Sequence, residues 1–303
     1  RVVVLRDGNL INDNVDPRKV STKELSEMMV GREVNLQARR PAKHIGEVCL
    51  KVENLTVEED GKEKVKNVSF AIHHGEILGI AGIEGNGQTQ IIEALTGLRK
   101  PKSMKLTLDG KEVTGKSSDF LKAGIGHVPE DRLSMGLVKE MSVMENMVLG
   151  YHRESEFCSK KGLLLKKQIS QYAEKLKKDF LVKAASIYSA VSSLSGGNQQ
   201  KIIISRVFSR EPKAIIVAHP TRGVDIGATE YIHNQLIELR DRGAAVLLIS
   251  ADLDEVRALS DRILVLYEGE IVSESMPGEL SEVEMGLLMT GGNYMVEEGK
   301  QRD

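Results

Sequence analysis

Residues 82–89, GIEGNGQT, lie between a continuous apolar run and a stretch with helical spacing. Glycines at these spacings let backbone N–H groups curve around an anion at the start of a helix. A tight turn would explain the glycines alone. The frame G-x-x-G-x-G-x-T between a strand and a helix indicates a loop that binds phosphate. Its candidate binding residues are Gly82, Glu84, Gly85, Asn86, Gly87, Gln88, Thr89 and Gln90.

A second segment, LSGGNQQK at 194–201, places a serine and two glycines at the start of a predicted helix. Backbone amides at a helix start form a positive end that can grip a terminal phosphate. A flexible turn with an N-cap would also explain these residues. It would not explain their place one short helix before an apolar strand that ends in HPTRGVD. The candidate residues are Leu194, Ser195, Gly196, Gly197, Asn198 and Gln199.

Three continuous apolar runs, at 76–82, 214–220 and 244–251, are typical of central strands. A helical stretch follows each run, which predicts a mainly parallel sheet built of βαβ units. Residues 48–57 and 67–72 alternate like half-buried strands. A helix is predicted at 162–180, with a packing stripe of Ile169, Tyr172, Leu176 and Phe180 and lysines on its other face.

Composition excludes several classes of function. The 303 residues carry 42 Lys and Arg against 44 Asp and Glu, a net charge of −2, so the general attraction for nucleic acid is absent. No apolar run approaches the roughly 18 residues that span a bilayer. Cys49 and Cys158 lack metal-ligand spacing, so we expect two reduced thiols in a cytoplasmic protein.

The two ends of the chain resemble each other. RVVVLRDGNLI at 1–11 matches RILVLYEGEIV at 262–272, and each reads as a β-hairpin with a glycine turn. A serine-initiated helix follows at nearly matched distance, at 20–31 and at 280–291. We therefore expect 1–35 to be the tail of a preceding repeat unit, in agreement with the missing initiator Met, and the chain to be the second half of a tandem protein. Residues 36–46 are expected to form a linker, 47–292 the main domain and 293–303 a disordered tail.

The ordered motifs from the phosphate loop to the LLIS strand at 247–250 resemble those of ATP-binding cassette (ABC) ATPases. The resemblance implies an α/β fold, a P-loop NTPase core with an antiparallel β subdomain and a helical signature subdomain at about 131–210. VPEDR at 128–132, LSGGNQQK and PTRGVD together resemble the C-terminal cassette of tandem ATPases that import simple sugars and nucleosides. The GNGQ of the phosphate loop is more similar to the nucleoside branch.

The sequence departs from the family pattern where the family does its chemistry. Gln88 replaces the phosphate-loop lysine of the family pattern, and Glu130 replaces the Q-loop glutamine. Ala218 and His219 replace the acidic pair that serves Mg²⁺ and the attacking water, and Ala251 replaces the switch histidine. Residues 50–67 contain no aromatic residue to stack on adenine. His219 is a substitute base or a spectator, and the missing helpers favour a spectator. We expect an inert site with at most weak phosphate or Mg²⁺ binding through the Thr89 hydroxyl.

The resemblance also implies the partners. The signature residues would complete the ATP–Mg²⁺ site of an N-terminal cassette of the same protein, with Asp225 at the D-loop position of the interface. Residues 130–147 would couple to integral membrane permease subunits on the cytoplasmic face, with an extracellular substrate-binding protein acting indirectly. Two alternatives remain. One is a soluble tandem ABC protein acting on ribosomes or nucleic acid, and the other is an autonomous P-loop enzyme such as a small-molecule kinase.

Overall fold

The computed structural model describes residues 1–6, 8–31, 33 and 41–292. The predicted tail at 293–303, and residues 36–40 of the predicted linker, lie outside the described residues. Among the described residues, no helix has both the length and the apolar character that crossing a membrane requires.

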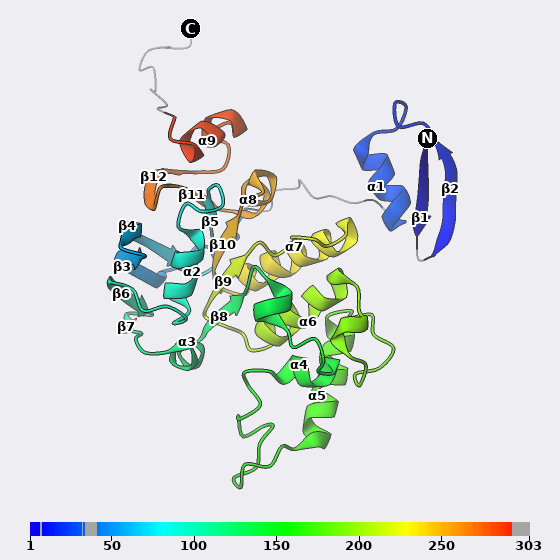
Figure 1. The fold of residues 1–303 in the computed structure, drawn as a ribbon, viewed down its shortest axis with the longest axis horizontal. Coiled ribbons are helices and arrows are strands. Elements are labelled where there is room, and N and C mark those ends of the chain that lie inside the picture. The colour runs from blue at the N-terminus through cyan, green and yellow to red at the C-terminus, as the bar shows by residue number, and fades with distance from the viewer. Residues whose placement is uncertain (7, 32, 34–40, 293–303) are drawn as a thin grey trace.

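A six-stranded sheet forms the centre, in the order β12-β11-β5-β10-β9-β8 (Figure 1). β11, β5, β10, β9 and β8 run parallel, and β12 pairs antiparallel with β11. Every residue of β5, β9 and β10 is buried, as their continuous apolar runs predict. The bounds are β5 Ile77–Ala81, β8 Ile125–Val128, β9 Ala214–Ala218, β10 Ala245–Ser250, β11 Arg262–Tyr267 and β12 Glu270–Ser275.

An antiparallel sheet with the order β4-β3-β6-β7 covers one side of this core. Helix α2 (Gln88–Leu95) contacts β3 and β4 in this sheet and β9 in the central one, so one hydrophobic core spans both. Helix α3 (Ser117–Ala123) leads into β8. The strands are β3 Val48–Glu59, β4 Lys62–His73, β6 Ser103–Leu108 and β7 Lys111–Glu112. The expected α/β class with an antiparallel subdomain is confirmed.

Helices α4, α5 and α6 gather in a lobe beside β8 (Figure 1). In α5, Ile169 and Leu176 are buried and Tyr172 and Phe180 pack against the same cores, which confirms the predicted stripe. The bounds are α4 Val143–Val148, α5 Lys166–Asp179 and α6 Gly196–Phe208, with a π-helical turn at Arg132–Gly136 and a 3₁₀ turn at Val191–Ser193. Helices α7 (Ile226–Asp241) and α8 (Leu253–Leu259) follow β9 and β10.

Both predicted hairpin-and-helix units are present. The first is β1 (Val2–Arg6), β2 (Asn9–Val15) and α1 (Thr22–Val30), and the second is β11, β12 and α9 (Glu282–Met289). Each helix begins with a capping box, because Ser21 and Ser281 accept the backbone N–H three residues later. The first unit stands apart from the central sheet on the side of α7 (Figure 1), where α1 contacts α7.

Candidate functional site

The candidate residues meet at one edge of the central sheet. β5, β10 and β9 are parallel neighbours, and Ala81 pairs with Ser250 while Ala218 pairs with Ile249. The phosphate loop, the Ala251 turn and the His219 loop leave the carboxyl ends of these three strands. In open parallel sheets, ligands bind in the crevice at this edge. The fold therefore brings together three segments that are far apart in the sequence.

The phosphate loop has the backbone shape that its glycines predict. Gly85 and Gly87 have φ of 97° and 107°, in the left-handed region that favours glycine. A β-carbon on Gly85 would meet nothing within 4 Å, whereas one on Gly87 would lie 2.6 Å from the Lys64 carbonyl oxygen. The loop is fastened to the second hairpin unit, because Gly269 N–H donates to the Asn86 carbonyl at 3.0 Å and Asn86 Nδ2 to the Met289 carbonyl at 3.2 Å.

Gln88 occupies the interior of this loop. Its side chain is buried, and Nε2 donates to the Ile83 carbonyl at 2.9 Å. Its Oε1 is buried without a hydrogen-bond partner in the described part of the chain. A neutral amide therefore lies where a cation would strengthen phosphate binding. Of its neighbours, Thr89 is exposed, and Gln90 Nε2 donates to Glu59 Oε2 at 3.0 Å.

His219 lies beside Ala251 with its own backbone in the left-handed region, at φ 43°. The Ala251 backbone N–H donates to His219 Nδ1 at 3.3 Å. Because Nδ1 accepts this hydrogen bond, the ring proton of the neutral imidazole is assigned to Nε2. The ring thus has no free lone pair for a general base. A pocket of about 440 Å³ opens here, lined in part by Glu84, His219, Ala251, Asp252 and Glu255.

The signature segment starts α6 as predicted, with Ser195 as its N-cap residue. Asn198 Nδ2 donates to Ser195 Oγ at 2.9 Å. Gln199 is buried and donates to the Val191 and Leu194 carbonyls, so its amide positions the signature loop. A second pocket, of about 580 Å³, is lined by signature residues together with Asp225 and residues of the first hairpin unit, among them Ser195, Gly197, Asn198, Leu5 and Val30.

Sequence reasoning missed the contacts that join these segments. Glu130 and Arg222 form an ion pair across the site. Arg132 Nη1 donates to the Arg222 carbonyl at 2.9 Å, and a β-carbon on Gly196 would lie 2.7 Å from Arg132 Nη2. Two residues of the VPEDR segment thus hold the HPTRGVD loop next to the signature. The segment itself was visible in the sequence, but its partners were not.

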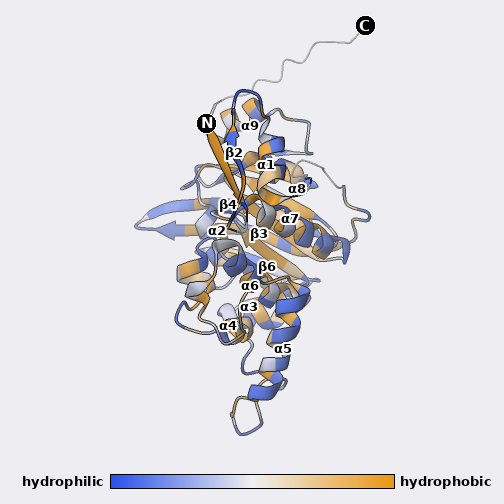
Figure 2. Ribbon diagram, turned by 90° about the vertical axis from the view of Figure 1, so that its right-hand side faces the viewer, coloured by the Kyte–Doolittle hydropathy of each residue, from blue (hydrophilic) through white to orange (hydrophobic). Residues whose placement is uncertain are grey.

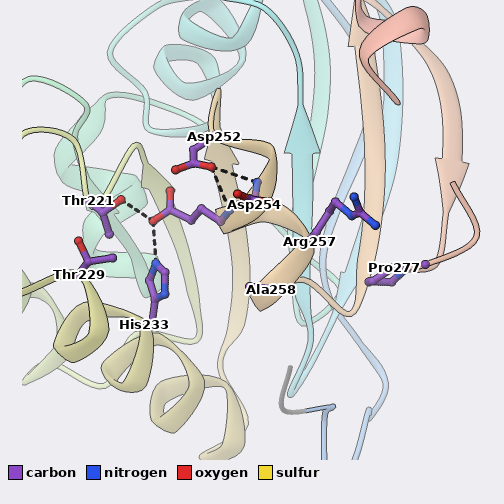
Figure 3. Close-up of a pocket in the computed structure, with 10 residues that line it drawn as sticks. Thr221, Thr229, His233, Asp252, Asp254, Arg257, Ala258 and Pro277 are labelled. Atoms are coloured by element: carbon purple, nitrogen blue, oxygen red, sulfur yellow. Dashed lines mark hydrogen bonds and ion pairs between the residues drawn. The ribbon is translucent and has the colours of Figure 1, made fainter. Parts of the chain in front are cut away.

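A buried carboxylate in the wall of the first pocket was also missed. Glu255 Oε1 accepts hydrogen bonds from Thr221 Oγ1 at 2.7 Å and from His233 Nε2 at 3.0 Å. Figure 3 shows Thr221 and His233 converging on this group from two directions. Its Oε2 is buried without a hydrogen-bond partner in the described residues. The cluster joins the HPTRGVD loop, α7 and α8, and no motif in the sequence links them.

A further cluster lies at the opposite edge of the sheet. Cys49, His74 and Asp109 place possible ligand atoms within 4.8 Å of one another, which their spacing in the sequence does not reveal. Lys213 Nζ already neutralises Asp109, at 2.6 Å from Oδ2. Burial, and then the nearby Asp109 charge, raise the pKa of the Cys49 thiol to about 12, which opposes the thiolate that metals prefer. We therefore interpret the cluster as structural.

A model of the ABC transporter family matches residues 65–222, slightly more than half of the chain. This match covers the phosphate loop, the signature and residues 219–222 of the HPTRGVD loop. The chain belongs to the ABC transporter family. This cassette is 43% identical over 295 residues to the nucleoside import ATP-binding protein NupA of Lactococcus lactis, a match that covers 97% of the chain and 58% of NupA.

Other relatives agree. Identity to the guanosine import ATP-binding protein NupO of Bacillus subtilis is 43%, covering 96% of the chain and 57% of NupO. The chain thus spans less than two thirds of these relatives. The cassette also resembles a solved nucleotide-free ATP-binding cassette of an ABC transporter, with a TM-score of 0.65, 24% identity and coverage of 80% of this chain and 96% of the other. That likeness shows the fold.

Proposed function

We propose that this chain is the C-terminal cassette of a tandem ABC ATPase that drives import of nucleosides or simple sugars. Two similar proteins are named for nucleoside and guanosine import, and another relative, 38% identical, for ribose import in Bacillus cereus. The chain covers 58% of NupA, which leaves room for a first cassette. The single observation that carries the tandem arrangement is the position of the first hairpin unit.

In this cassette, the second hairpin unit holds the phosphate loop, through Asn86, Gly269 and Met289. The first unit repeats it, so it would hold the phosphate loop of a preceding cassette in the same way. It lies against the signature side of this chain, where Leu5 and Val30 share a pocket with Ser195 and Asp225. The preceding phosphate loop would then face this signature. That is a head-to-tail pair of cassettes.

The two ATP sites of this pair of cassettes would differ in activity. The start of α6 offers the Gly196 and Gly197 amides and Ser195 to the terminal phosphate of ATP held by the first cassette. Asp225 would lie at the interface between the cassettes. ATP and Mg²⁺ would be used mainly at that composite site.

The site of this cassette fits phosphate better than metal. The left-handed Gly85 and Gly87 leave backbone N–H groups to wrap an anion. Ala218 offers no oxygen ligand to Mg²⁺, and the exposed Thr89 hydroxyl is the remaining candidate. His219 accepts the Ala251 N–H and so does not activate water. Loss of a general base alone costs about 10² to 10⁴ in rate. We therefore infer that nucleotide bound here is retained without hydrolysis.

The proposed complex lies on the cytoplasmic face of the membrane as a peripheral component. Residues 130–147 would meet the permease subunits, and Leu133 and Met135 in this segment expose 38% and 52% of their surface. Exposed apolar side chains of this kind favour a protein contact. A substrate-binding protein outside the cell would act through the permease, without touching this chain.

The test compares the two ATP sites in the tandem protein. Ser195→Arg places a bulky cation at the start of α6 and should abolish hydrolysis, because it prevents the composite site from binding the terminal phosphate of ATP. Gln88→Ala should leave most of the activity, since its site does not turn over. Ser118→Arg, the same change at an exposed position in α3, is the matched control. Steady-state phosphate release measures all three.

The opposite ranking of Ser195→Arg and Gln88→Ala would show that the assignment of the working site is wrong. The chain of 303 residues by itself should release phosphate from Mg²⁺–ATP at the background rate. Robust turnover by this chain would contradict the inert site without bearing on the family or on the tandem arrangement.

A further inference from the structure

The loop between α4 and α5 exposes leucines and lysines together. We call residues 159–167 the basic tip. Leu163 and Leu164 at its centre expose 67% and 52% of their surface. The exposed lysines on either side are Lys160, Lys161, Lys166 and Lys167. The loop projects at the end of the helical lobe (Figure 1), at the end of the molecule opposite α9 (Figure 2).

The basic tip has a defined structure. Ser159 and Leu163 exchange hydrogen bonds, with Ser159 N–H donating to the Leu163 carbonyl at 2.9 Å and Leu163 N–H to Ser159 Oγ at 3.1 Å. Leu165 N–H donates to the carbonyl of the buried Phe157 at 2.8 Å. The backbone therefore holds both leucines outward. Folding leaves apolar surface in water at a place where polar residues would serve a simple turn.

The positive charge of the basic tip is opposed by no direct ion pair among the described residues, although the Glu145 carboxylate interacts electrostatically with Lys166. Residues 157–173 contain no Asp or Glu, and none of the four lysines forms an ion pair with another described residue. Glu154 and Glu156, just before the tip, are both paired with Arg210 at 3.1 Å. Glu145 caps α4 by accepting the Ser142 backbone N–H at 2.8 Å. The nearby carboxylates thus have partners of their own.

We propose that the basic tip docks this chain directly on an anionic lipid bilayer. The lysine ammonium groups contact headgroup phosphates, and Leu163 and Leu164 enter the boundary with the acyl chains. Lysines around exposed leucines are the composition that binds such a surface. Nucleic acid would use the lysines but not the leucines. A protein partner needs about 800 Å² of surface per side, which a projecting segment of nine residues supplies poorly.

The basic tip would bind lipid whether or not the chain belongs to a tandem protein or contacts a permease. The basic tip lies outside the phosphate loop and the signature, and it follows closely on the segment 130–147. A lipid contact at this end would keep the cassette at the membrane surface when the permease is absent.

The experiment is flotation of the 303-residue chain with vesicles of phosphatidylcholine containing about a third phosphatidylglycerol, against vesicles of phosphatidylcholine alone. The chain should float with the anionic vesicles and lose binding as salt rises. Leu163→Ser with Leu164→Ser should weaken binding about tenfold, and glutamine at all four tip lysines should weaken it at least as much. All changed side chains are exposed, so circular dichroism should show an unchanged fold.

The matched control removes the same charge elsewhere, with glutamine at the exposed Lys62, Lys111, Lys116 and Lys122. Its binding should stay within about twofold of the unchanged chain. Failure of the chain to bind anionic vesicles, or equal losses in the tip and control variants, would overturn the proposal. So would full competition by soluble glycerol phosphate, since the ligand would then be a free phosphate compound.

Discussion

Gln88 is buried inside the phosphate loop, and His219 lines the neighbouring pocket of about 440 Å³. In the proposed site Gln88 stands where the family pattern has a lysine, and its amide already donates to the Ile83 carbonyl, so a bound phosphate would rely on backbone N–H groups. A hydrogen bond to a charged group contributes about 1.5–3 kcal/mol, which sets the scale of that loss. His219 accepts a hydrogen bond at Nδ1. Its Nε2 proton makes it a hydrogen-bond donor in the pocket rather than a base.

A single residue, His127, should also make the free energy of unfolding depend on pH. Burial, and then the positive charge of Arg206, lower the pKa of the His127 imidazole to about 4. In the unfolded chain the imidazole binds a proton below about pH 6.5, whereas the folded state excludes it until about pH 4. Neutral His127 therefore makes its full contribution to the free energy of unfolding above pH 6.5. That free energy falls by up to about 3 kcal/mol as the pH falls to 4.

Urea unfolding of His127→Phe between pH 7 and 4 measures this loss. The variant should show a smaller decrease in the free energy of unfolding than the unchanged chain, because Phe does not titrate. His152→Phe, the same exchange at a histidine in the turn after α4, is the matched control. Parallel curves for the unchanged chain and His127→Phe would disprove the role of His127.

Among the elements, helix α7 is locked to the central sheet at the edge opposite the phosphate loop. Arg240 and Asp261 form a fully buried ion pair, with Nη1 and Oδ1 3.2 Å apart. Asp261 also accepts the backbone N–H groups of Ile77, at the start of β5, and Ala42. One carboxylate thus joins α7, β5 and the segment that enters the main domain.

We predict that Arg240→Met lowers the free energy of unfolding by about 3–5 kcal/mol, because it leaves the buried Asp261 without its cation. Arg242→Met, at the end of the same helix, removes an arginine that is largely exposed and should cost less than about 1 kcal/mol. Urea denaturation of both variants makes the comparison. A similar cost for the two would show that the buried pair does not hold α7 in place.

For the whole molecule, the decisive feature is where the first hairpin unit lies. A β-carbon built on Gly227 in α7 would be 3.7 Å from Val30 Cγ1 in α1. Val30 and Gly227 share a pocket with the signature residues. In the proposed tandem arrangement, this docked unit marks the side from which the preceding cassette would approach.

A disulfide tests this docking. Val30→Cys with Gly227→Cys, in a Cys158→Ser background, should cross-link under mild oxidation, because a β-carbon at position 227 would lie 3.7 Å from the present Val30 Cγ1. Thr22→Cys with Gly227→Cys is the control, since Thr22 lies at the other end of α1. Mobility without reductant detects the closed loop. Equal cross-linking of both pairs, or of neither, would mean that α1 does not rest on α7 in solution.

The sequence by itself determined the class of fold, the positions of the main buried strands, the two hairpin units and the positions of the phosphate and signature loops. These features depend on apolar periodicity, glycines and helix caps, which act within a few residues of one another. The expected mainly parallel sheet and antiparallel subdomain are confirmed. The domain boundaries and the roles of the site residues stay predictions.

Only the tertiary structure decided how the side chains of the site are used. Three sets of contacts join residues that are 22 to 92 positions apart in the sequence. They are Glu130 with Arg222, Glu255 with Thr221 and His233, and the Ala251 N–H with His219. The tertiary structure alone also decided the docking of α1 on α7 and the exposure of the two leucines of the basic tip. Such contacts depend on which strand ends and helices the fold places side by side, and local patterns do not encode that.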